Sequence, residues 1–572
     1  MMARWRLLFT AAFLISSSWA DRQLYVFTVG EDGDVVQQVE TDNPIKYFKT
    51  VQDSNVIAKA LLNPTYKETG WDIIEIKTNE AFTDEEQAYA AGYVEGKVTH
   101  DAIYRHWYNT LEDICRDQEK ICEEVEDFVK TNLKWLRRGM DAYSNSSDYW
   151  HQVKLYYTQL EGMADGYSSA NSSPKTVLRV QDIHLLNNPD LSDIVEVIKA
   201  RKNNFTNIDP GKDPKVLGLL RCSALIKVLP DGREMYAAQD TWSEYGSMLR
   251  FQKKYDFAFH NISNPQEVIP GRAMTFSSYP GVITSGDDFY VISSGLVTME
   301  TTIGNSNASL WRYVKPEKQI SEGVRSMVAN RLARNGREWS EIFSKFNSGT
   351  YNNQWMVVDY NKFKKGTKPE DLPDELLWIA EQIPGYIRSE DMTSVLRKQG
   401  YWPSYNVAFF EDVFNKSGNQ PMVDKFGDWF TYDRTPRALI FKRDHVKVDS
   451  LKSMLALMRY NDFRNDPLSA CDCTPPYSGE NAIAARCDLN PRNGSYPFPA
   501  LGHRSHGATD AKITSQTLIL NGLQFLAVSG PPFNLTNGIP PFQWSKTDFA
   551  NITRHVGHPD LWEFKPIIHI WS

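Results

Sequence analysis

A single cysteine at the start of a strand-like run is the side chain best suited to chemistry in this sequence. Cys222 opens the stretch CSALIKVLPDGREMYAAQDTW, in which apolar residues precede a Pro-Asp-Gly turn and a second strand returns. The turn predicts a three-residue hairpin loop with Leu229 opposite Arg233. Carried outward, this register places Cys222 opposite Asp240, and a bulge would shift the partner by one residue. Either way, the polar run 239–241 lies beside Cys222, with a distance of about 5 Å between the Cβ atoms of facing residues.

A thiol needs a base before it attacks a carbonyl group. The sequence contains none of the common hydrolase motifs that would identify such a base or another catalytic group. Gly-x-Ser-x-Gly, His-Glu-x-x-His and the papain and caspase cysteine motifs do not occur. One remaining route is cleavage just before Cys222, which would give this residue a free α-amine as its base. The pKa of an α-amine, about 7.7–8.0, is close to that of a thiol, about 8.5. The other interpretation is a buried, inert cysteine, and both stay open on the residues alone.

Two histidines and an aspartate in the C-terminal part of the chain are possible metal ligands, at a spacing found in metal sites. His503, His506 and Asp510 lie in GHRSHGATD, but an isolated His-x-x-His is usually incidental and no further set completes a site. We therefore expect neither a metal nor another cofactor. His555 and His558 are interpreted as loop residues that respond to acidic pH.

The elements that position Cys222 are predicted from hydrophobic patterns. Three short strands, QLYVFTV, DVVQQVE and WDIIEIKT, precede a helical region that begins with the capping box of Thr83 and Glu86 and runs to about Met163. Residues 200–216 are polar, with proline and glycine, and predict an exposed loop open to proteolysis. The stretch 272–304 is strand-rich, as is the Cys222 hairpin.

Two further helical segments are predicted in the C-terminal half, around 320–346 and 371–398. The chain has 572 residues, 41% of them hydrophobic and 12% aromatic, which is enough for a large core in one α/β unit or several domains. The net charge of -8 and the absence of a basic stripe argue against a nucleic-acid partner.

The N-terminus predicts entry into the secretory pathway. Arg4 and Arg6 precede an apolar core and a small-residue site, so residues 1–20 are expected to be a signal peptide rather than a membrane anchor. No other stretch is long enough to span a bilayer. Nine Asn-x-Ser/Thr sequons agree with a lysosomal or secreted glycoprotein. The acceptor residues are Asn145, Asn171, Asn204, Asn261, Asn307, Asn415, Asn493, Asn534 and Asn551.

Six cysteines allow disulfides in such a compartment. The candidates are Cys115, Cys122, Cys471, Cys473 and Cys487, whose pairing the sequence leaves open. In one unbroken helix, Cys115 and Cys122 would lie about 10 Å apart, so a bridge between them requires a break in the helix. Cys222 has no cysteine within ninety residues on either side.

The motifs from Cys222 onward resemble the phospholipase B-like (lamina ancestor-like) family, most closely its lysosomal second mammalian type. They include CSALIKVLP, SGDDFYVISSGLVTMETTIGN, FNSGTYNNQWMVVDY, LMRYNDF, GENAIAARCDLNP and PPFQWSK, and they cover most of the larger part of the chain. The resemblance implies an α+β fold, the four-layered αββα sandwich of N-terminal nucleophile hydrolases. It also implies self-cleavage between Arg221 and Cys222 into chains 21–221 and 222–572 that stay associated as one unit.

Site residues are carried over from the same resemblance. Cys222 falls at the nucleophile, and Asp240 resembles the aspartate that anchors the α-amine in related cysteine amidases. Asn353 is the expected oxyanion donor, with Asn352 as the other choice, because an amide stabilises negative charge without a competing proton transfer. A turn role for these two asparagines is the alternative interpretation. Glu300 is expected to orient the site or to form an ion pair.

The chain departs from the family pattern at Gln239, where related members carry histidine. Glutamine can neither act as a base nor carry charge, which puts a proton-shuttle role for that position in doubt. Gln239, Thr241, Trp242, Tyr351 and Asn352 are expected to line the pocket. The function implied is hydrolysis of an acyl ester of a lipid through a Cys222 thioester. The alternatives are an amidase for N-acyl lipids or other amides, and a non-catalytic lysosomal lipid-binding glycoprotein; the oligomeric state is open.

Overall fold

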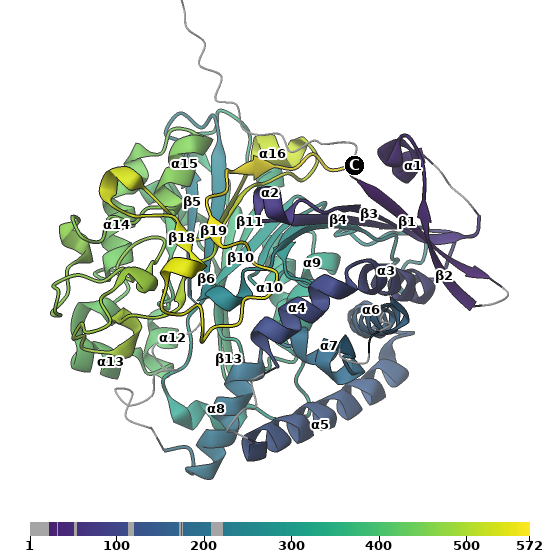
Figure 1. The fold of residues 1–572 in the computed structure, drawn as a ribbon, viewed down its shortest axis with the longest axis horizontal. Helices are drawn as coiled ribbons and strands as arrows, with labels where there is room; N and C mark the ends of the chain where they lie inside the picture. Colours follow the sequence, from purple (N-terminus) through teal and green to yellow (C-terminus); the bar gives the residue numbers. More distant parts are fainter. Residues whose placement is uncertain are drawn as a thin grey trace, which may run out of the picture.

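The computed structural model describes residues 22–30, 33–50, 54–112, 119–170, 173, 176–206 and 221–572. It is a mixed α+β structure with two large sheets (Figure 1). The larger sheet has eleven strands in the order β13-β12-β11-β10-β9-β8-β7-β4-β3-β1-β2. Its strands are β1 (Gln23–Gly30), β2 (Gly33–Val39), β3 (Val56–Asn63), β4 (Asp72–Thr78), β7 (Phe251–Asp256), β8 (Ala273–Ser278), β9 (Phe289–Ile292), β10 (Leu296–Thr302), β11 (Asn353–Asp359), β12 (Leu377–Ile383) and β13 (Tyr386–Asp391).

The second sheet has seven strands in the order β14-β5-β6-β16-β17-β20, with β15 also paired to β6. These strands are β5 (Arg221–Val228), β6 (Met235–Glu244), β14 (Tyr401–Ser404), β15 (His506–Ala508), β16 (Asp510–Ser515), β17 (Leu526–Ser529) and β20 (Ile567–Ile568). A separate pair, β18 (Phe542–Gln543) and β19 (Leu561–Trp562), lies near the C-terminus.

Sixteen α-helices occur in the described ranges. They are α1 (Pro44–Thr50), α2 (Tyr66–Thr69), α3 (Asp84–Val98), α4 (His100–Thr110), α5 (Glu119–Tyr143), α6 (Asp148–Ala170), α7 (Val180–Leu186), α8 (Leu191–Lys202), α9 (Glu322–Leu332), α10 (Gly336–Phe343), α11 (Thr393–Gln399), α12 (Glu411–Lys416), α13 (Asn419–Phe426), α14 (Pro436–Asp444), α15 (Leu451–Met458) and α16 (Gln516–Leu520). None of these helices is long and apolar enough to cross a membrane.

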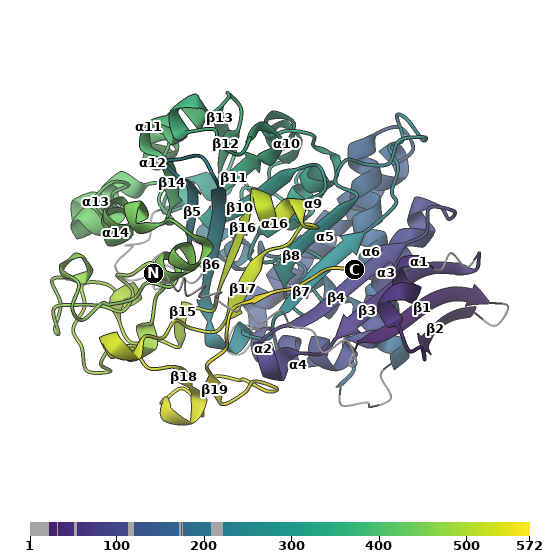
Figure 2. The ribbon, with the colours of Figure 1, turned by 90° about the horizontal axis from the view of Figure 1, so that it is seen from above.

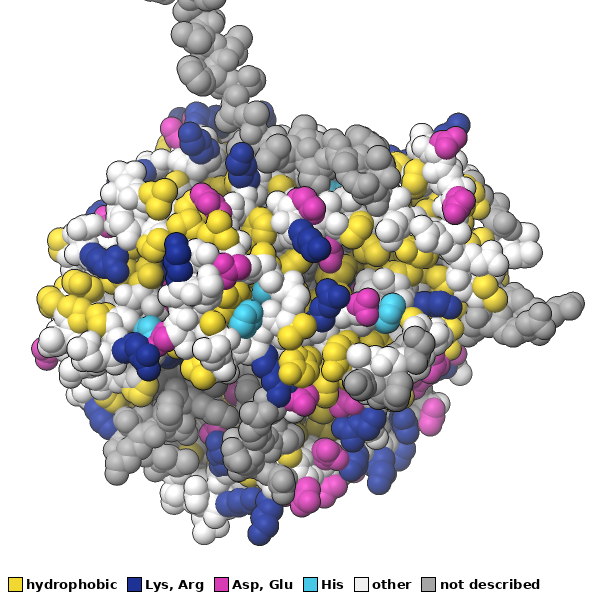
Figure 3. All heavy atoms as spheres, viewed as in Figure 1, with side chains coloured by type: hydrophobic (Ala, Val, Ile, Leu, Met, Phe, Trp, Pro, Cys, Tyr) yellow, Lys and Arg dark blue, Asp and Glu magenta, His cyan; other side chains and the backbone are white. Residues whose placement is uncertain are grey.

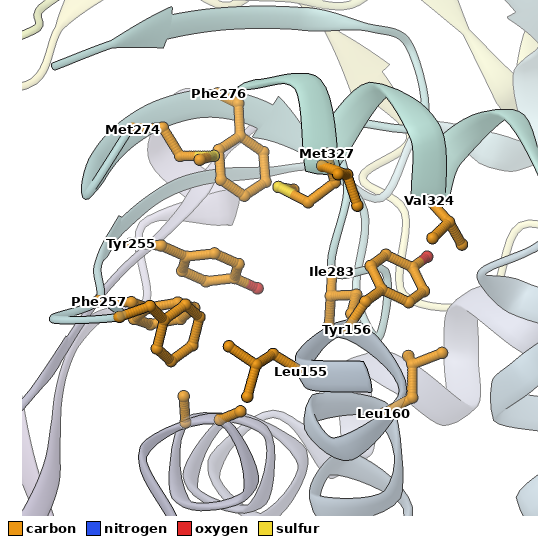
Figure 4. Close-up of a cluster of buried hydrophobic side chains, with 14 of the residues drawn as sticks. Leu155, Tyr156, Leu160, Tyr255, Phe257, Met274, Phe276, Ile283, Val324 and Met327 are labelled. Carbon is orange, nitrogen blue, oxygen red and sulfur yellow. The ribbon is translucent and has the colours of Figure 1, made fainter. Parts of the chain in front are cut away.

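The three largest hydrophobic cores of the described residues lie on the faces of the two sheets. Between the sheets, Ala224 and Ile226 of β5 pack with Met299 of β10 and Met356 of β11. On the other face of the larger sheet, strand side chains pack against α3, α6, α9 and α10; Figure 4 shows Leu155 and Tyr156 below the strand side chains in this core. On the outer face of the smaller sheet, a third core includes residues of α14 and α15.

The larger sheet joins the two halves of the chain. β4 lies before residue 221 and β7 after it, and the two pair in parallel, with Asp72 opposite Phe251. Figure 2 shows the purple N-terminal strands continuing directly into the teal strands of the same sheet. Backbone hydrogen bonds therefore connect the segments on either side of Cys222 independently of the peptide bond that precedes it.

Close contact between α3 and α6 explains four glycines in the helical region. A Cβ atom on Gly92 would lie 1.9 Å from the carbonyl oxygen of Gln159, and one on Gly162 would lie 2.1 Å from that of Tyr89. Gly96 and Gly166 make equivalent contacts one turn further along. Larger residues would therefore force these helices apart.

Most predicted elements are confirmed, including the three early strands, the Thr83–Glu86 capping box and the helices within 320–346. The helix predicted over 371–398 is wrong. β12 and β13 lie in the middle of that segment, and its one α-helix is the short α11. Every residue of β12 is buried, and its apolar start, 377–380, is too short for its period to distinguish a buried strand from a buried helix.

Candidate active site

Cys222 lies at the start of β5 as a free, buried thiol that is 4% exposed. Ala224 and Ile226, on the same face of the strand, belong to the core between the sheets. Because side chains alternate along a strand, the thiol points toward the larger sheet. The backbone of Arg221 belongs to β5, whereas residues 207–220 lie outside the described ranges.

The hairpin is confirmed, but its predicted register is wrong by one residue. Cys222 pairs with Thr241, and Ser223 pairs with Asp240. The Leu229 N–H donates to the carbonyl oxygen of Glu234 at 3.0 Å, so the loop contains four residues rather than three. Of the two neighbours that a shift allowed, Thr241 is the partner.

The Asp240 side chain consequently lies on the face of the smaller sheet opposite to the Cys222 thiol. Its neighbour Ala238 belongs to the outer core, and its Oδ1 accepts a hydrogen bond from the Ser223 N–H at 2.7 Å. Its Oδ2 is buried and has no hydrogen-bond partner in the described part of the chain. Burial raises the pKa of Asp240 well above its usual range. The side chain therefore holds the backbone one residue beyond the nucleophile candidate.

Two residues that the sequence did not reveal hold the backbone of Cys222. Asn406 Oδ1 accepts from the Cys222 N–H at 3.2 Å, and Asn406 Nδ2 donates to the carbonyl oxygen of Thr302 at 2.7 Å. Arg437 Nη1 donates to the Cys222 carbonyl oxygen at 2.6 Å and to Asn406 Oδ1 at 2.8 Å. The Arg437 guanidinium also lies over the ring of Trp242, 4.5 Å from its centroid. No motif marks either residue in WPSYNVAFF or DRTPRALIF.

Gln239 joins β6 to the larger sheet. Its Nε2 donates to the carbonyl oxygens of Asp287 at 2.8 Å and Glu300 at 2.7 Å. Its Oε1 is buried without a hydrogen-bond partner among the described residues. The position at which the family resemblance implies histidine thus holds a donor to two backbone carbonyl groups.

A buried ion network lies beside Thr241. Lys512 Nζ contacts Asp287 and Asp510 at 2.9 Å each, and Arg250 pairs with the same two carboxylates. Thr241 Oγ1 donates to Asp287 Oδ2 at 2.9 Å and accepts from Lys512 at 2.6 Å. Burial alone would raise the pKa of Asp287, but Arg250 and Lys512 outweigh it and hold that pKa well below its usual range.

Carboxyl groups with raised pKa values gather around Tyr351. The Tyr351 hydroxyl donates to Glu300 Oε1 at 3.3 Å. Burial and the neighbouring Asp287 raise the pKa of Asp288 to about 8, and burial with Asp288 raises that of Glu300 well above its usual range. Burial, reinforced by Glu300, raises the pKa of the Cys222 thiol, although Lys512 opposes this. The thiol is therefore protonated at neutral pH and needs a base.

The two asparagines proposed for the oxyanion make other contacts. Asn353 Nδ2 makes a long contact of 3.5 Å with Glu322 Oε1 on α9, and its Oδ1 has no hydrogen-bond partner among the described residues. Asn352 Nδ2 donates to the Gly349 carbonyl oxygen at 3.0 Å and its Oδ1 accepts from Gln382 at 3.4 Å. Asn352 is thus tied into a loop.

The two histidines and the aspartate of GHRSHGATD, for which no metal site was expected, contact different partners. His503 Nε2 contacts Asp548 at 3.0 Å, Asp510 belongs to the ion network, and His506 lies 4.0 Å from Cys487 Sγ. Glu480, Cys487 and His506 together place possible metal-ligand atoms within 4.8 Å of one another. The Arg504 guanidinium donates to Glu480 at 3.0 Å and to Cys487, so a positive charge already faces this cluster.

The remaining cysteines and sequons can be placed only in part. Cys471 and Cys473 form a disulfide, Cys122 is disulfide-bonded, and Cys487 is free, while Cys115 lies outside the described residues. Six sequon asparagines are exposed: Asn145, Asn204, Asn415, Asn493, Asn534 and Asn551. Asn307 is half-buried, Asn261 is buried at 7% exposure, and Asn171 lies outside the described ranges.

Comparisons with known proteins extend over nearly the whole chain. The family model for Phospholipase B matches residues 58–569. The mouse protein named "Putative phospholipase B-like 2" is 46% identical over 526 residues, covering 91% of this chain and 86% of the relative. The human protein of that name is 46% identical over 523 residues, with 91% and 86% coverage. "Phospholipase B-like protein B" of Dictyostelium discoideum is 40% identical over 516 residues, with 90% and 85% coverage. The chain therefore belongs to the phospholipase B family.

Proposed function

We propose that this protein is a self-processing cysteine hydrolase that removes an acyl chain from a lipid. The observation that carries the proposal is the arrangement at the start of β5. Asn406 and Arg437 hold the N–H and the carbonyl oxygen of Cys222 while its thiol faces the space between the sheets. A residue whose backbone is fixed on both sides is suited to become a catalytic N-terminus.

In this account the chain is cut between Arg221 and Cys222. Two sheets with helices packed on their outer faces support an αββα sandwich of the N-terminal nucleophile hydrolase type. The β4–β7 pairing supports continued association of chains 21–221 and 222–572, because cleavage breaks none of its hydrogen bonds. The apolar segment of residues 1–20 and the exposed sequons support a lysosomal or secreted protein.

The freed α-amine of Cys222 would face Asn406 Oδ1, which now accepts from its N–H. The amine takes the thiol proton as Sγ bonds to the acyl carbon, and it returns that proton to the leaving alcohol as the C–O bond breaks. Water then attacks the thioester, the acid leaves, and Sγ regains its proton. Asn353 is the oxyanion donor that the family resemblance implies. Its side-chain amide now donates to Glu322 of α9, on the face of the larger sheet away from the thiol, so it must turn from that contact to reach the substrate oxygen. An N-acyl amide would react through the same steps, with an amine as leaving group.

The experiment is to alkylate the mature protein with iodoacetamide and compare hydrolysis of a phosphatidylcholine and an N-acyl amide. We expect the mass addition at Cys222 to rise in parallel with loss of hydrolysis. Cys487→Ser is the matched control, because Cys487 is the other free cysteine in the described part of the chain. Hydrolysis that persists with Cys222 fully alkylated would reject the mechanism. Processing without turnover of either substrate would favour the lipid-binding glycoprotein.

A further inference from the structure

A groove on the surface between α5 and α7 is not used by the proposed reaction. It encloses a cavity of about 260 Å³. Its α5 side is formed by residues spaced three and four apart, which lie on one face of the helix. The lining residues are Glu126, Val129, Lys130, Leu133, Lys134 and Arg137 of α5, with Arg179, Val180, Gln181, His184 and Leu185 from the α7 region.

The lining of this groove combines hydrocarbon with positive charge. Val129, Leu133 and Leu185 are apolar, and Val180 is 50% exposed. Four of the lining residues are lysine or arginine and one is acidic, in a chain whose net charge is -8. Figure 3 shows Lys and Arg side chains gathering at the lower right, where Figure 1 places α5.

Two of these cations are available to a ligand. Lys130 pairs with Glu126 at 3.2 Å, and Arg179 pairs with Asp182 at 2.9 Å. Lys134 and Arg137 are both exposed and make no ion pair with any described residue. The neighbouring Arg138 differs, since it pairs with Glu317 at 2.9 Å and does not line the groove.

His184, at one end of the groove, carries no positive charge. His184 lines both the groove and an inner cavity of about 50 Å³, and its Nε2 is buried with no hydrogen-bond partner in the described ranges. Burial and the nearby Arg137 lower the pKa of His184 to about 4. The imidazole is therefore uncharged at pH 5 and above and adds no positive charge at depth.

We propose that this groove binds the anion of a fatty acid, with the alkyl chain against Val129 and Leu133 and the carboxylate between Lys134 and Arg137. The cavity is smaller than the roughly 300–1,000 Å³ of sites for larger ligands, which suits a single chain. A carboxylate beside two cations stays ionised above about pH 4.5. The assignment rests on the proposed function in one respect, because a fatty acid is the product of lipid deacylation.

The test is titration calorimetry of dodecanoate into the Cys222→Ala protein at pH 6, compared with the same protein carrying Lys134→Gln and Arg137→Gln together. We expect the affinity to fall about 3- to 10-fold, as for two partly exposed ion pairs. Arg138→Gln, the matched control, should leave affinity within about two-fold of the parent. Butyrate and dodecyltrimethylammonium, which lack the chain or the negative charge, should not bind.

An unchanged dodecanoate affinity in the double variant would overturn the proposal, as would equal binding of dodecyltrimethylammonium. Circular dichroism checks that the double variant is folded, and exposed α5 positions make misfolding an inadequate explanation for a selective loss. Because Cys222→Ala removes turnover, binding is measured independently of catalysis. Failure here would leave hydrolysis intact, and failure of hydrolysis would leave this binding intact.

Discussion

The backbone N–H of Cys222 donates to the side-chain oxygen of Asn406, 184 residues further along the chain, at 3.2 Å. Asn406 is itself fixed by Thr302 and Arg437, and its φ of +68° lies in the left-handed region that asparagine tolerates better than most residues. The N-terminal side of β5 is thus held by a rigid polar contact.

Asn406→Ala should slow processing at Cys222. The variant loses the acceptor for the Cys222 N–H, so the scissile peptide is no longer oriented, and a loss of about ten-fold in rate is expected. Pulse-chase gels of the precursor measure it. Asn521→Ala, at an exposed position just after α16 and outside any sequon, is the control, and equal processing of both variants would refute the role of Asn406.

Arg437→Lys should lower both stability and activity. A lysine cannot span the carbonyl oxygens of Cys222 and Tyr405 with one planar group, so a buried acceptor is left unpaired at a cost of about 1–3 kcal/mol. Thermal unfolding and hydrolysis rates test this. Arg434→Lys, on the exposed side of the same segment, should change neither, and an Arg437→Lys protein indistinguishable from the parent would contradict the assignment.

Gln239→Leu should destabilise the protein by about 1–3 kcal/mol, because the carbonyl oxygens of Asp287 and Glu300 would lose their shared donor in a buried site. Differential scanning calorimetry measures the change. Gln239→His is the informative second variant. If the histidine that the family resemblance implies here acts as a proton shuttle, this change should raise the hydrolysis rate despite a lower Tm. If the hydrolysis rate and Tm both fall, position 239 has a structural role in this chain.

Stability should fall as pH rises from about 6.5 to 8. Burial raises the folded-state pKa of Asp288 to about 8 and that of Asp193 to about 7, while the unfolded values stay near 4. In this window the folded state binds more protons than the unfolded state, so the free energy of unfolding decreases with pH. Buried His106 and half-buried His184, with pKa values lowered to about 3 and 4, have the opposite effect only below about pH 6.5.

Asp288→Asn should flatten this decline by about 1–2 kcal/mol between pH 6.5 and 8, because it removes a carboxyl group that must ionise while buried. Thermal unfolding at a series of pH values is the measurement. Asp433→Asn is the control, since that side chain is 73% exposed. A Tm that rises across the same window in the parent would show that other groups dominate.

The local part of the site could be predicted from sequence because it is a hairpin. Pro230, Asp231 and Gly232 specify a turn, and any short loop brings residues 239–241 beside Cys222. The register could not be fixed, because tertiary contacts help to set the loop. Gly366 donates to the Gly232 carbonyl oxygen at 2.7 Å, and a Cβ on Gly232 would lie 2.2 Å from the Thr367 oxygen.

The distant part of the site has no sequence signal of its own. Asn406 and Arg437 reach Cys222 only because β14 pairs with β5 and because α14 packs on the outer face of the same sheet. The helix prediction for residues 371–398 is wrong for a related reason. Burial on both faces removes the alternation that would have identified β12 as a strand.

The most direct test of the central claim is the N-terminal sequence of the larger fragment in purified protein. We expect this fragment to begin at Cys222, the Cys222→Ala chain to stay intact between residues 221 and 222, and Cys487→Ser to be processed as the parent is. A larger fragment that begins elsewhere, or an intact chain that hydrolyses lipid at the full rate, would contradict it.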